Sequence, residues 1–181
     1  MNNVILSDLY RYEGDKNRSL LIQLKYIFFI PSFTYIYFFR KASGSSFILW
    51  KMLLRITMYI TGIQIPIGTI IGKGFRIAHF GTIVINPDTV IGKNFDIAPG
   101  VVIGYSEGKR KGCPTIGNNV VVKANAVIAG NIKIGNDVLI APGAFVNFDC
   151  PDNSIVIGNP GTILKRDTSP SNKYIGFFVN E

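Results

Sequence analysis

The sequence predicts a mainly β protein, a parallel β-helix solenoid preceded by a small α-helical region, and three observations support this fold class. First, branched aliphatic residues recur every six positions over much of the chain. Second, the next residue is usually small or a turn former, such as Gly72 or Gly117. Third, residues 1–62 lack this period and contain long apolar runs. The register comprises Ile65, Ile71, Ile77, Ile85, Ile91, Ile97, Ile103, Ile116, Val122, Ile128, Ile134, Ile140 and Val146.

A six-residue period excludes the ordinary repeating elements. An amphipathic helix places apolar residues three to four positions apart, and a half-buried strand alternates every two. Six residues fit one short strand and a bend, so three units form a triangular coil of roughly 18 residues with equivalent side chains stacked inside. β-branched residues suit this narrow, extended interior. The alternative, a β-sandwich, would show turns about every 8–12 residues.

Residues 1–62 are predicted to form a helical N-terminal region. The apolar stretch from Leu20 to Phe39 raises the question of a membrane-spanning helix, but Lys25 and Pro31 make such a helix costly and broken. A second stretch, from Phe47 to Ile60, carries two cations four residues apart. We expect two or three amphipathic helices joined around residues 42–46. Their apolar faces would pack on each other and on a partner subunit, with peripheral membrane contact as the alternative.

Composition and charge indicate which partners the protein binds and in which cellular compartment it is found. The net charge is +8 although only 17% of the residues are charged, so the basic excess is dilute. We therefore expect no nucleic acid as a partner, because a polyanionic cofactor or an anionic surface explains the same excess. The two cysteines, Cys113 and Cys150, lack metal-ligand spacing and indicate a reducing compartment. Charges interrupt the amino terminus before any apolar run, so we expect no signal peptide and a cytoplasmic location, with membrane-peripheral attachment as the alternative.

His79 is the only histidine of the chain and lies at a predicted corner of the solenoid. It is not at an inward aliphatic position, so its side chain should point outward. A lone histidine is ordinarily a surface or packing residue. Near a glycine-rich loop, however, it could act as a general base for acyl transfer while backbone amides stabilise an oxyanion. A zinc site built from several histidines is excluded, and we expect no metal.

The six-residue period is interrupted between Ile103 and Ile116 by a polar, glycine-rich segment with three consecutive cations, which begin at Lys109. Solenoids accommodate insertions as corner loops, often on the binding face. The cations are either a solvated loop tip or contacts for the phosphate groups of a cofactor or an anionic acceptor.

Segment 62–165 contains short motifs that together are specific for one family. They are Gln64-Ile65-Pro66, Ile71-Gly72-Lys73-Gly74, Ala78-His79-Phe80-Gly81-Thr82, Val90-Ile91-Gly92, Gly112-Cys113-Pro114-Thr115-Ile116-Gly117, Ile128-Ala129-Gly130-Asn131-Ile132 and Ile157-Gly158-Asn159-Pro160-Gly161-Thr162-Ile163. With these motifs the segment resembles the hexapeptide-repeat acyltransferases, and among them the serine acetyltransferase branch. The resemblance implies a left-handed β-helix over residues 63–165, followed by a tail over residues 166–181.

The resemblance also implies an acetyl-CoA-dependent O-acyltransferase that is a homotrimer, with acetyl-CoA bound between adjacent β-helices and His79 as general base. Gln64 falls where the family has the aspartate that orients this histidine, and it could hydrogen-bond the imidazole. The implied cofactor-binding residues are Gly104 and Tyr105, as candidate oxyanion donors, with Lys123, Ala124 and Lys165. The implied substrate-binding residues are Ala78, Lys109, Arg110 and Cys113.

Three departures from the family pattern bear on the acceptor. Ala78 and Gln64 stand where the family has aspartates, and Cys113 stands where it has a second histidine. Without those carboxylates the ammonium group of serine would be poorly paired, whereas a sugar hydroxyl needs no such partner. We expect acetylation of a carbohydrate hydroxyl in a capsular or surface polysaccharide or its precursor. The alternatives are serine O-acetylation for cysteine biosynthesis and a non-catalytic trimeric scaffold, and we expect Cys113 to be a loop thiol rather than a nucleophile.

Overall fold

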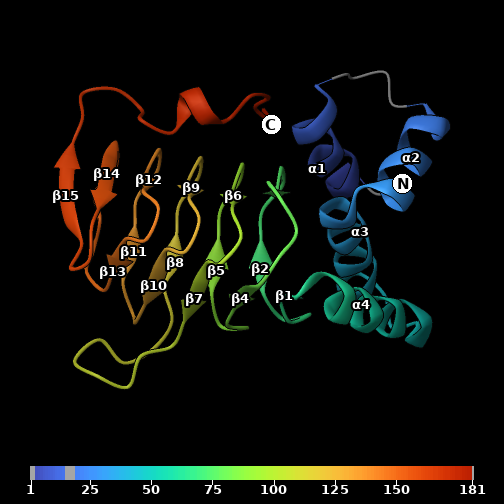
Figure 1. Ribbon diagram of the computed structural model, residues 1–181, viewed down its shortest axis with the longest axis horizontal. Coiled ribbons are helices and arrows are strands. Elements are labelled where there is room, and N and C mark those ends of the chain that lie inside the picture. Colours follow the sequence, from blue (N-terminus) through green and yellow to red (C-terminus); the bar gives the residue numbers. More distant parts are fainter. Residues whose placement is uncertain (1–2, 15–18, 181) are drawn as a thin grey trace.

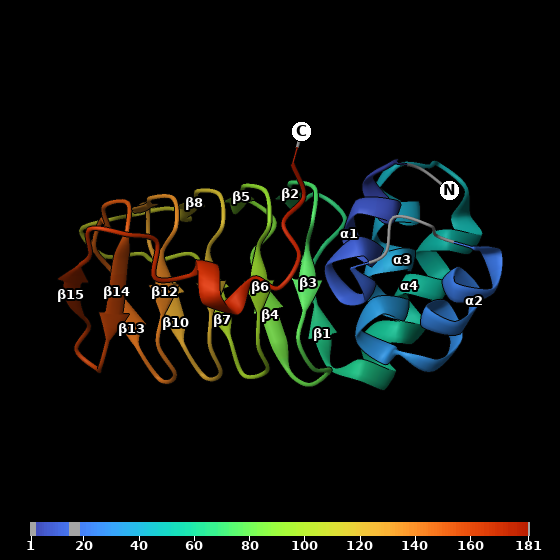
Figure 2. The same ribbon diagram turned by 90° about the horizontal axis from the view of Figure 1, so that it is seen from above.

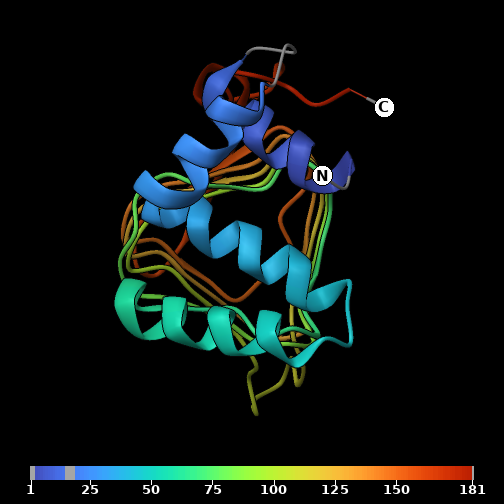
Figure 3. The same cartoon turned by 90° about the vertical axis from the view of Figure 1, so that its right-hand side faces the viewer.

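The computed structural model describes residues 3–14 and 19–180, which form a helical cap at one end of a three-sided left-handed β-helix (Figures 1 and 3). The predicted fold class is confirmed. The helices are α1 (Asn3–Glu13), α2 (Leu20–Phe29), α3 (Pro31–Ser43) and α4 (Ile48–Thr61). We expected two or three helices, and this was wrong because α1 is an additional one. Its charged residues Asp8 and Arg11 are buried.

The β-helix consists of three sheets that the chain visits in turn. Sheet A contains β1 (Ile63–Gln64), β4 (Ile83–Ile85), β7 (Val102–Gly104), β10 (Val127–Ala129) and β13 (Phe145–Val146). Sheet B contains β2 (Ile70–Ile71), β5 (Val90–Ile91), β8 (Thr115–Ile116) and β11 (Lys133–Ile134). Sheet C contains β3 (Arg76–Ile77), β6 (Asp96–Ile97), β9 (Val121–Val122), β12 (Leu139–Ile140), β14 (Ser154–Ile157) and β15 (Thr162–Lys165). Pairing is parallel except between β14 and β15, which is antiparallel.

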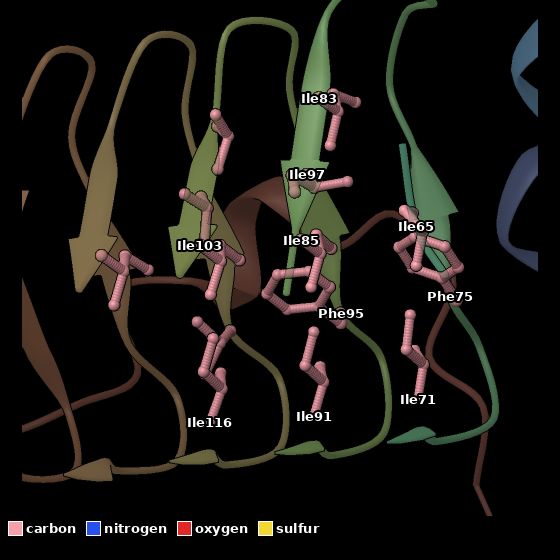
Figure 4. Close-up of a cluster of buried hydrophobic side chains, with 14 of the residues drawn as sticks. Ile65, Ile71, Phe75, Ile83, Ile85, Ile91, Phe95, Ile97, Ile103 and Ile116 are labelled. Atoms are coloured by element: carbon pink, nitrogen blue, oxygen red, sulfur yellow. The ribbon is translucent and has the colours of Figure 1, made fainter. Parts of the chain in front are cut away.

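The residues of the six-residue register fill the interior of the prism. Ile71 pairs with Ile91 and Ile91 with Ile116, so these side chains stack in one column (Figure 4). Beside this column the Phe75 and Phe95 rings stack with centroids 6.0 Å apart. Every aliphatic residue of the register is buried, which confirms that the six-residue spacing marks the inward positions.

The cap satisfies the backbone groups that the first coil would otherwise leave unpaired. Because β1, β2 and β3 lie at the ends of their sheets, no preceding coil can pair with them. Tyr35 exchanges two hydrogen bonds with the backbone of Ile65, and Tyr12 does the same with Ile77. Aromatic side chains of α1 and α3 thus close the open end of the solenoid.

Buried charges complete this closure. Arg40 donates to the carbonyl oxygens of Ile71 and Gly72 and forms an ion pair with Asp8 at 2.8 Å. The second carboxylate oxygen of Asp8 accepts from the Phe75 amide. In a second cluster, Arg11 donates to Gly74 and pairs with Asp96, which also meets Arg76. These contacts hold α1 and α3 against the first two coils.

Pro31 and Gly62, which lie at helix ends, set the geometry of the cap. Pro31 starts α3, where its missing amide hydrogen carries no penalty, and α2 and α3 meet there at a bend of 106°. Gly62 ends α4 in the left-handed conformation, with φ of 74°, and turns the chain into β1. Among the described helices none alone is long and apolar enough to cross a membrane, and only the bent pair of α2 and α3 meets that criterion together.

The tail after β15 folds back over sheet C toward the cap (Figure 2). Ile175, which follows a short 3₁₀ helix (Asn172–Tyr174), packs on Val121 and Leu139. Further on, Asn94 bonds Val179, and the Phe177 ring lies 5.9 Å from the Tyr10 ring. The tail therefore contacts its own chain.

Candidate active site

Most of the candidate site residues lie on two different edges of the prism. The connections from sheet C to sheet A, here called the C–A edge, are residues 78–82, 98–101, 123–126 and 141–144. The connections from sheet A to sheet B, the A–B edge, include the long loop of residues 105–114. Sheet A separates the two edges within one chain.

His79 lies on the C–A edge, in the bend between β3 and β4, and its side chain is exposed. The adjacent Ala78 donates its amide hydrogen to the Ile97 carbonyl oxygen, which holds the bend against the next coil. Phe80 presents a ring that is more than half exposed beside it. The outward position expected for the histidine is thus confirmed, and the imidazole is accessible to a substrate.

Gln64 lies close to this corner but makes no hydrogen bond to His79 within the described chain. It is exposed on the outer face of β1 and pairs with Val84 of β4. The amide of Ile83, the residue directly after the corner that contains His79, donates to the carbonyl oxygen of Gly62, so β1 and the corner are neighbours. The orienting role of Gln64 remains a prediction.

A hollow beside Gln64 contains residues that the sequence reasoning did not include in the site. The hollow has a volume of about 270 Å³, and Arg55, Met58 and Tyr59 of α4 line it together with Gln64. Arg55 was recognised only as a cation on a helical face. Helix α4 packs against β1. This is a tertiary contact, and no local pattern in the sequence predicts it.

Two further candidates share the C–A edge with His79. Lys123 and Ala124 begin the connection between β9 and β10, and the Ala124 carbonyl oxygen accepts from the Gly143 amide one coil later. The Lys123 ammonium lies 3.9 Å from the centroid of the Tyr174 ring, so the tail contacts this cation. The four connections that define this edge contain neither Asp nor Glu.

The remaining loop candidates gather on the A–B edge. Gly104 ends β7, and Tyr105, Lys109 and Arg110 are exposed or half-exposed around it. Residues Ser106, Gly108, Lys109, Arg110, Ala129 and Asn147 line a hollow of about 350 Å³. Arg110 forms an exposed ion pair with Asp149 at 2.9 Å, so Lys109 is the cation of this hollow that remains available to an anion.

Cys113 lies near the end of the loop and is half-buried. Partial burial and the nearby Asp88 carboxylate raise the pKa of this thiol. A raised pKa keeps the sulfur protonated at neutral pH, which disfavours a role as nucleophile.

Lys165 lies apart from both groups. It pairs with Ser154 at the end of β14 where the chain arrives from sheet B, so the width of sheet C separates it from the C–A edge. The structure therefore gathers His79, Ala78, Lys123 and Ala124 on one edge, and Gly104, Tyr105, Lys109, Arg110 and Cys113 on another. No cluster of metal-ligating side chains is present among the described residues.

Comparisons with known proteins agree with this fold. The family model described as bacterial transferase hexapeptide (six repeats) matches residues 113–147. A serine acetyltransferase of Helicobacter pylori is 40% identical over 119 residues, which are 65% of this chain and 69% of that protein. One of Synechococcus elongatus is 37% identical over 118 residues, 64% of this chain and 48% of that protein. Soybean serine acetyltransferase complexed with serine superposes with a TM-score of 0.74 at 27% identity, covering 89% of this chain and 68% of that one.

The repeat, the triangular prism and these matches define a hexapeptide-repeat transferase. Within that class, the chain belongs to the branch that contains the serine acetyltransferases. It spans about half the length of several curated relatives it matches. The relatives named here are serine acetyltransferases, so the comparisons favour the serine alternative over the expected carbohydrate acceptor.

Proposed function

We propose that the chain is an acetyl-CoA-dependent O-acetyltransferase in which His79 is the general base. The observation that carries the proposal is one exposed imidazole, at a corner of a hexapeptide β-helix whose relatives are named as acetyltransferases. Acetyl-CoA supplies the acetyl group as a thioester and requires no metal.

The proposed step needs one base and one route for the proton. The imidazole nitrogen of His79 takes the proton from the acceptor hydroxyl as its oxygen attacks the thioester carbonyl carbon. The tetrahedral intermediate collapses by breaking the carbon–sulfur bond, and the imidazolium returns the proton to the departing sulfur. An acetyl ester and free CoA result. Backbone amides near Gly104 and Tyr105 are the proposed donors to the oxyanion.

The two edges support a site shared between copies of the chain. His79 and the loop residues Lys109 and Cys113 lie on different edges of one prism, with sheet A between them. Side chains on two edges meet around one ligand only if the C–A edge of one copy faces the A–B edge of another. A closed ring of three such contacts is the proposed homotrimer.

For the acceptor, we propose a neutral carbohydrate hydroxyl of a capsular or surface polysaccharide or its precursor. The residues of the C–A edge that surround His79 include no carboxylate, and the nearby hollow beside Gln64 contains Arg55. An amino-acid ammonium placed there would lose its water without gaining a counter-charge. A sugar hydroxyl avoids that cost.

Free serine is the second candidate, and the comparisons favour it. The relatives named above are serine acetyltransferases, and the soybean structure is described as complexed with serine. Arg55 beside Gln64 could pair with the carboxylate of serine. The ammonium would then need a carboxylate supplied by another copy of the chain.

Release of CoA from acetyl-CoA, followed with a thiol reagent, separates these readings. The purified chain is incubated with free serine, with a neutral saccharide panel, or with no acceptor. Acceptor-dependent release with a saccharide and none with serine supports the carbohydrate proposal. Release with serine alone replaces it by the second candidate. No release above the acceptor-free rate with any acceptor contradicts enzymatic function and favours the scaffold alternative.

A further inference from the structure

The outer surface of the helical cap is strongly apolar. On α2, Leu20, Leu21, Phe28 and Phe29 are each more than two thirds exposed. On α4, exposed apolar residues follow one another at helical spacing. They are Ile48, Leu49, Met52, Ile56, Tyr59 and Ile60. Isolated exposed apolar residues are common, but a set of this size on two helices that both pack on α3 indicates an interaction surface.

The charged residues of α2, α3 and α4 are all basic. The sequence contains no Asp or Glu between residues 16 and 87. Arg40 and Arg76 in this stretch are paired with buried carboxylates, whereas Lys25, Lys51 and Arg55 form no ion pair among the described residues. The latter three lie on α2 and α4 themselves, among the exposed apolar side chains.

Lys51 and Arg55 are also placed beside an apolar hollow. Together with Leu54, Met58 and residues 65–67 they line a space of about 360 Å³ between α4 and the first coil. Two cations among the apolar lining of a hollow match the combination of a phosphate headgroup and acyl chains.

We propose that α2 and α4 dock the cap on the surface of an anionic lipid bilayer. Leu, Ile and Phe side chains of the two helices enter the boundary between headgroups and acyl chains, and Tyr59 sits at the headgroup level. Lys25, Lys51 and Arg55 meet lipid phosphates. Both helices are too short to span a bilayer, and the 106° bend at Pro31 leads the chain from α2 back into the folded cap. The contact is therefore peripheral.

A bilayer fits this surface better than a second copy of the chain. In a two-fold contact the same patch meets itself, so a patch that carries Lys25, Lys51 and Arg55 would meet a second patch with the same three cations. No carboxylate on α2 or α4 is available to separate these like charges. An anionic bilayer provides both the apolar layer and the counter-charge.

Vesicle sedimentation of the full chain tests the proposal without any acetyl-transfer assay. The probes are vesicles of phosphatidylcholine alone and of phosphatidylcholine mixed with phosphatidylglycerol. The wild-type chain should sediment with the mixed vesicles, less with the neutral ones, and less at high salt. Phe28→Ser with Phe29→Ser, and Ile56→Ser with Ile60→Ser, should each weaken binding at least tenfold. Lys51→Gln with Arg55→Gln should weaken it by about fivefold per cation removed.

Matched controls lie at the other end of the molecule. Leu164→Ser on β15 removes an apolar side chain of 37% exposure, and Lys133→Gln on β11 removes an exposed cation. Both should leave vesicle binding unchanged, and circular dichroism verifies that each variant folds. The proposal is overturned if the wild-type chain ignores the mixed vesicles, or if control and cap variants weaken binding equally. It is equally overturned if the cap variants reduce only the oligomeric mass in light scattering, because a second copy then covers the surface.

Discussion

The hydroxyl of Tyr35 donates to the carbonyl oxygen of Ile65 at 3.0 Å and accepts from the amide of the same residue at 2.9 Å. One side chain of α3 thereby replaces both partners that a preceding coil would have offered to this backbone position. Both residues are fully buried, so water cannot take over either bond. The cap is consequently part of the solenoid rather than an appendage.

Replacing Tyr35 by Phe should lower the free energy of unfolding by about 1–3 kcal/mol, because the amide and carbonyl of Ile65 lose their partner in a dry site. Urea denaturation followed by circular dichroism measures this. Tyr59→Phe is the matched control, since the Tyr59 side chain is 80% exposed. A loss for Tyr35→Phe no larger than that of the control would show that the hydroxyl bridge does not stabilise the cap.

The two arginine ion pairs Arg40–Asp8 and Arg110–Asp149 have similar lengths and opposite burial. Arg40→Gln leaves the Asp8 carboxylate buried without its counter-charge, and breaking a buried pair in this way costs about 3–5 kcal/mol. Arg110→Gln, at an exposed pair, should cost under about 1 kcal/mol. Parallel urea titrations compare the two, and equal losses would contradict the structural role of the Arg40 pair.

Gly100 and Gly143 occupy equivalent corners with positive φ, at 79° and 69°. An added methyl group at Gly100 would collide with Asn125, whereas at Gly143 nothing lies within 4 Å. Gly143→Ala should lower the free energy of unfolding by about 1 kcal/mol through backbone strain alone. Gly100→Ala should lower it by more, because the collision adds to the strain. The difference between the thermal midpoints of the two variants measures the contribution of packing at Gly100. A lower midpoint for Gly143→Ala than for Gly100→Ala would contradict the contact between the coils at Gly100 and Asn125.

Both cysteines should be slow to react at neutral pH. Burial raises the pKa of Cys150 to about 11, and burial with the Asp88 charge raises the pKa of Cys113. Alkylation by iodoacetamide requires the thiolate, so its rate should increase about tenfold per pH unit below each pKa. Mass spectrometry of samples alkylated at pH 7 and above measures the rate at each cysteine. Modification of Cys113 at pH 7 faster than that of free cysteine would restore it as a candidate nucleophile.

The repeat made most of the β-helix predictable, because each coil repeats the same local rule of one inward aliphatic residue and one turn former. Ile71, Ile91 and Ile116 illustrate this, since spacing alone placed them inward and the register pairs them. The cap was less predictable. Asp8 and Arg11 look like surface residues in sequence and become buried only through partners far along the chain, at Arg40 and Asp96.

The candidate site was predictable in parts. The outward corner position of His79 followed from its place in the register. The resemblance named Ala78, Lys123 and Ala124, but their common place with His79 on the C–A edge emerged only once the strands were assigned to sheets. Lys165 falls outside both groups. Arg55 and Tyr59 reach the hollow beside Gln64 through packing of α4 on β1, for which the sequence contains no periodic signal.

The most direct measurement of the central claim is the steady-state rate of acetyl transfer by His79→Ala, using whichever acceptor the wild-type chain accepts. Because a positioned base contributes at least about 10²-fold, we predict a loss of that size with an unchanged unfolding transition. Lys93→Ala on the B–C side of the prism is the matched control and should retain the wild-type rate. Transfer by His79→Ala within a few-fold of the wild-type rate would contradict the account.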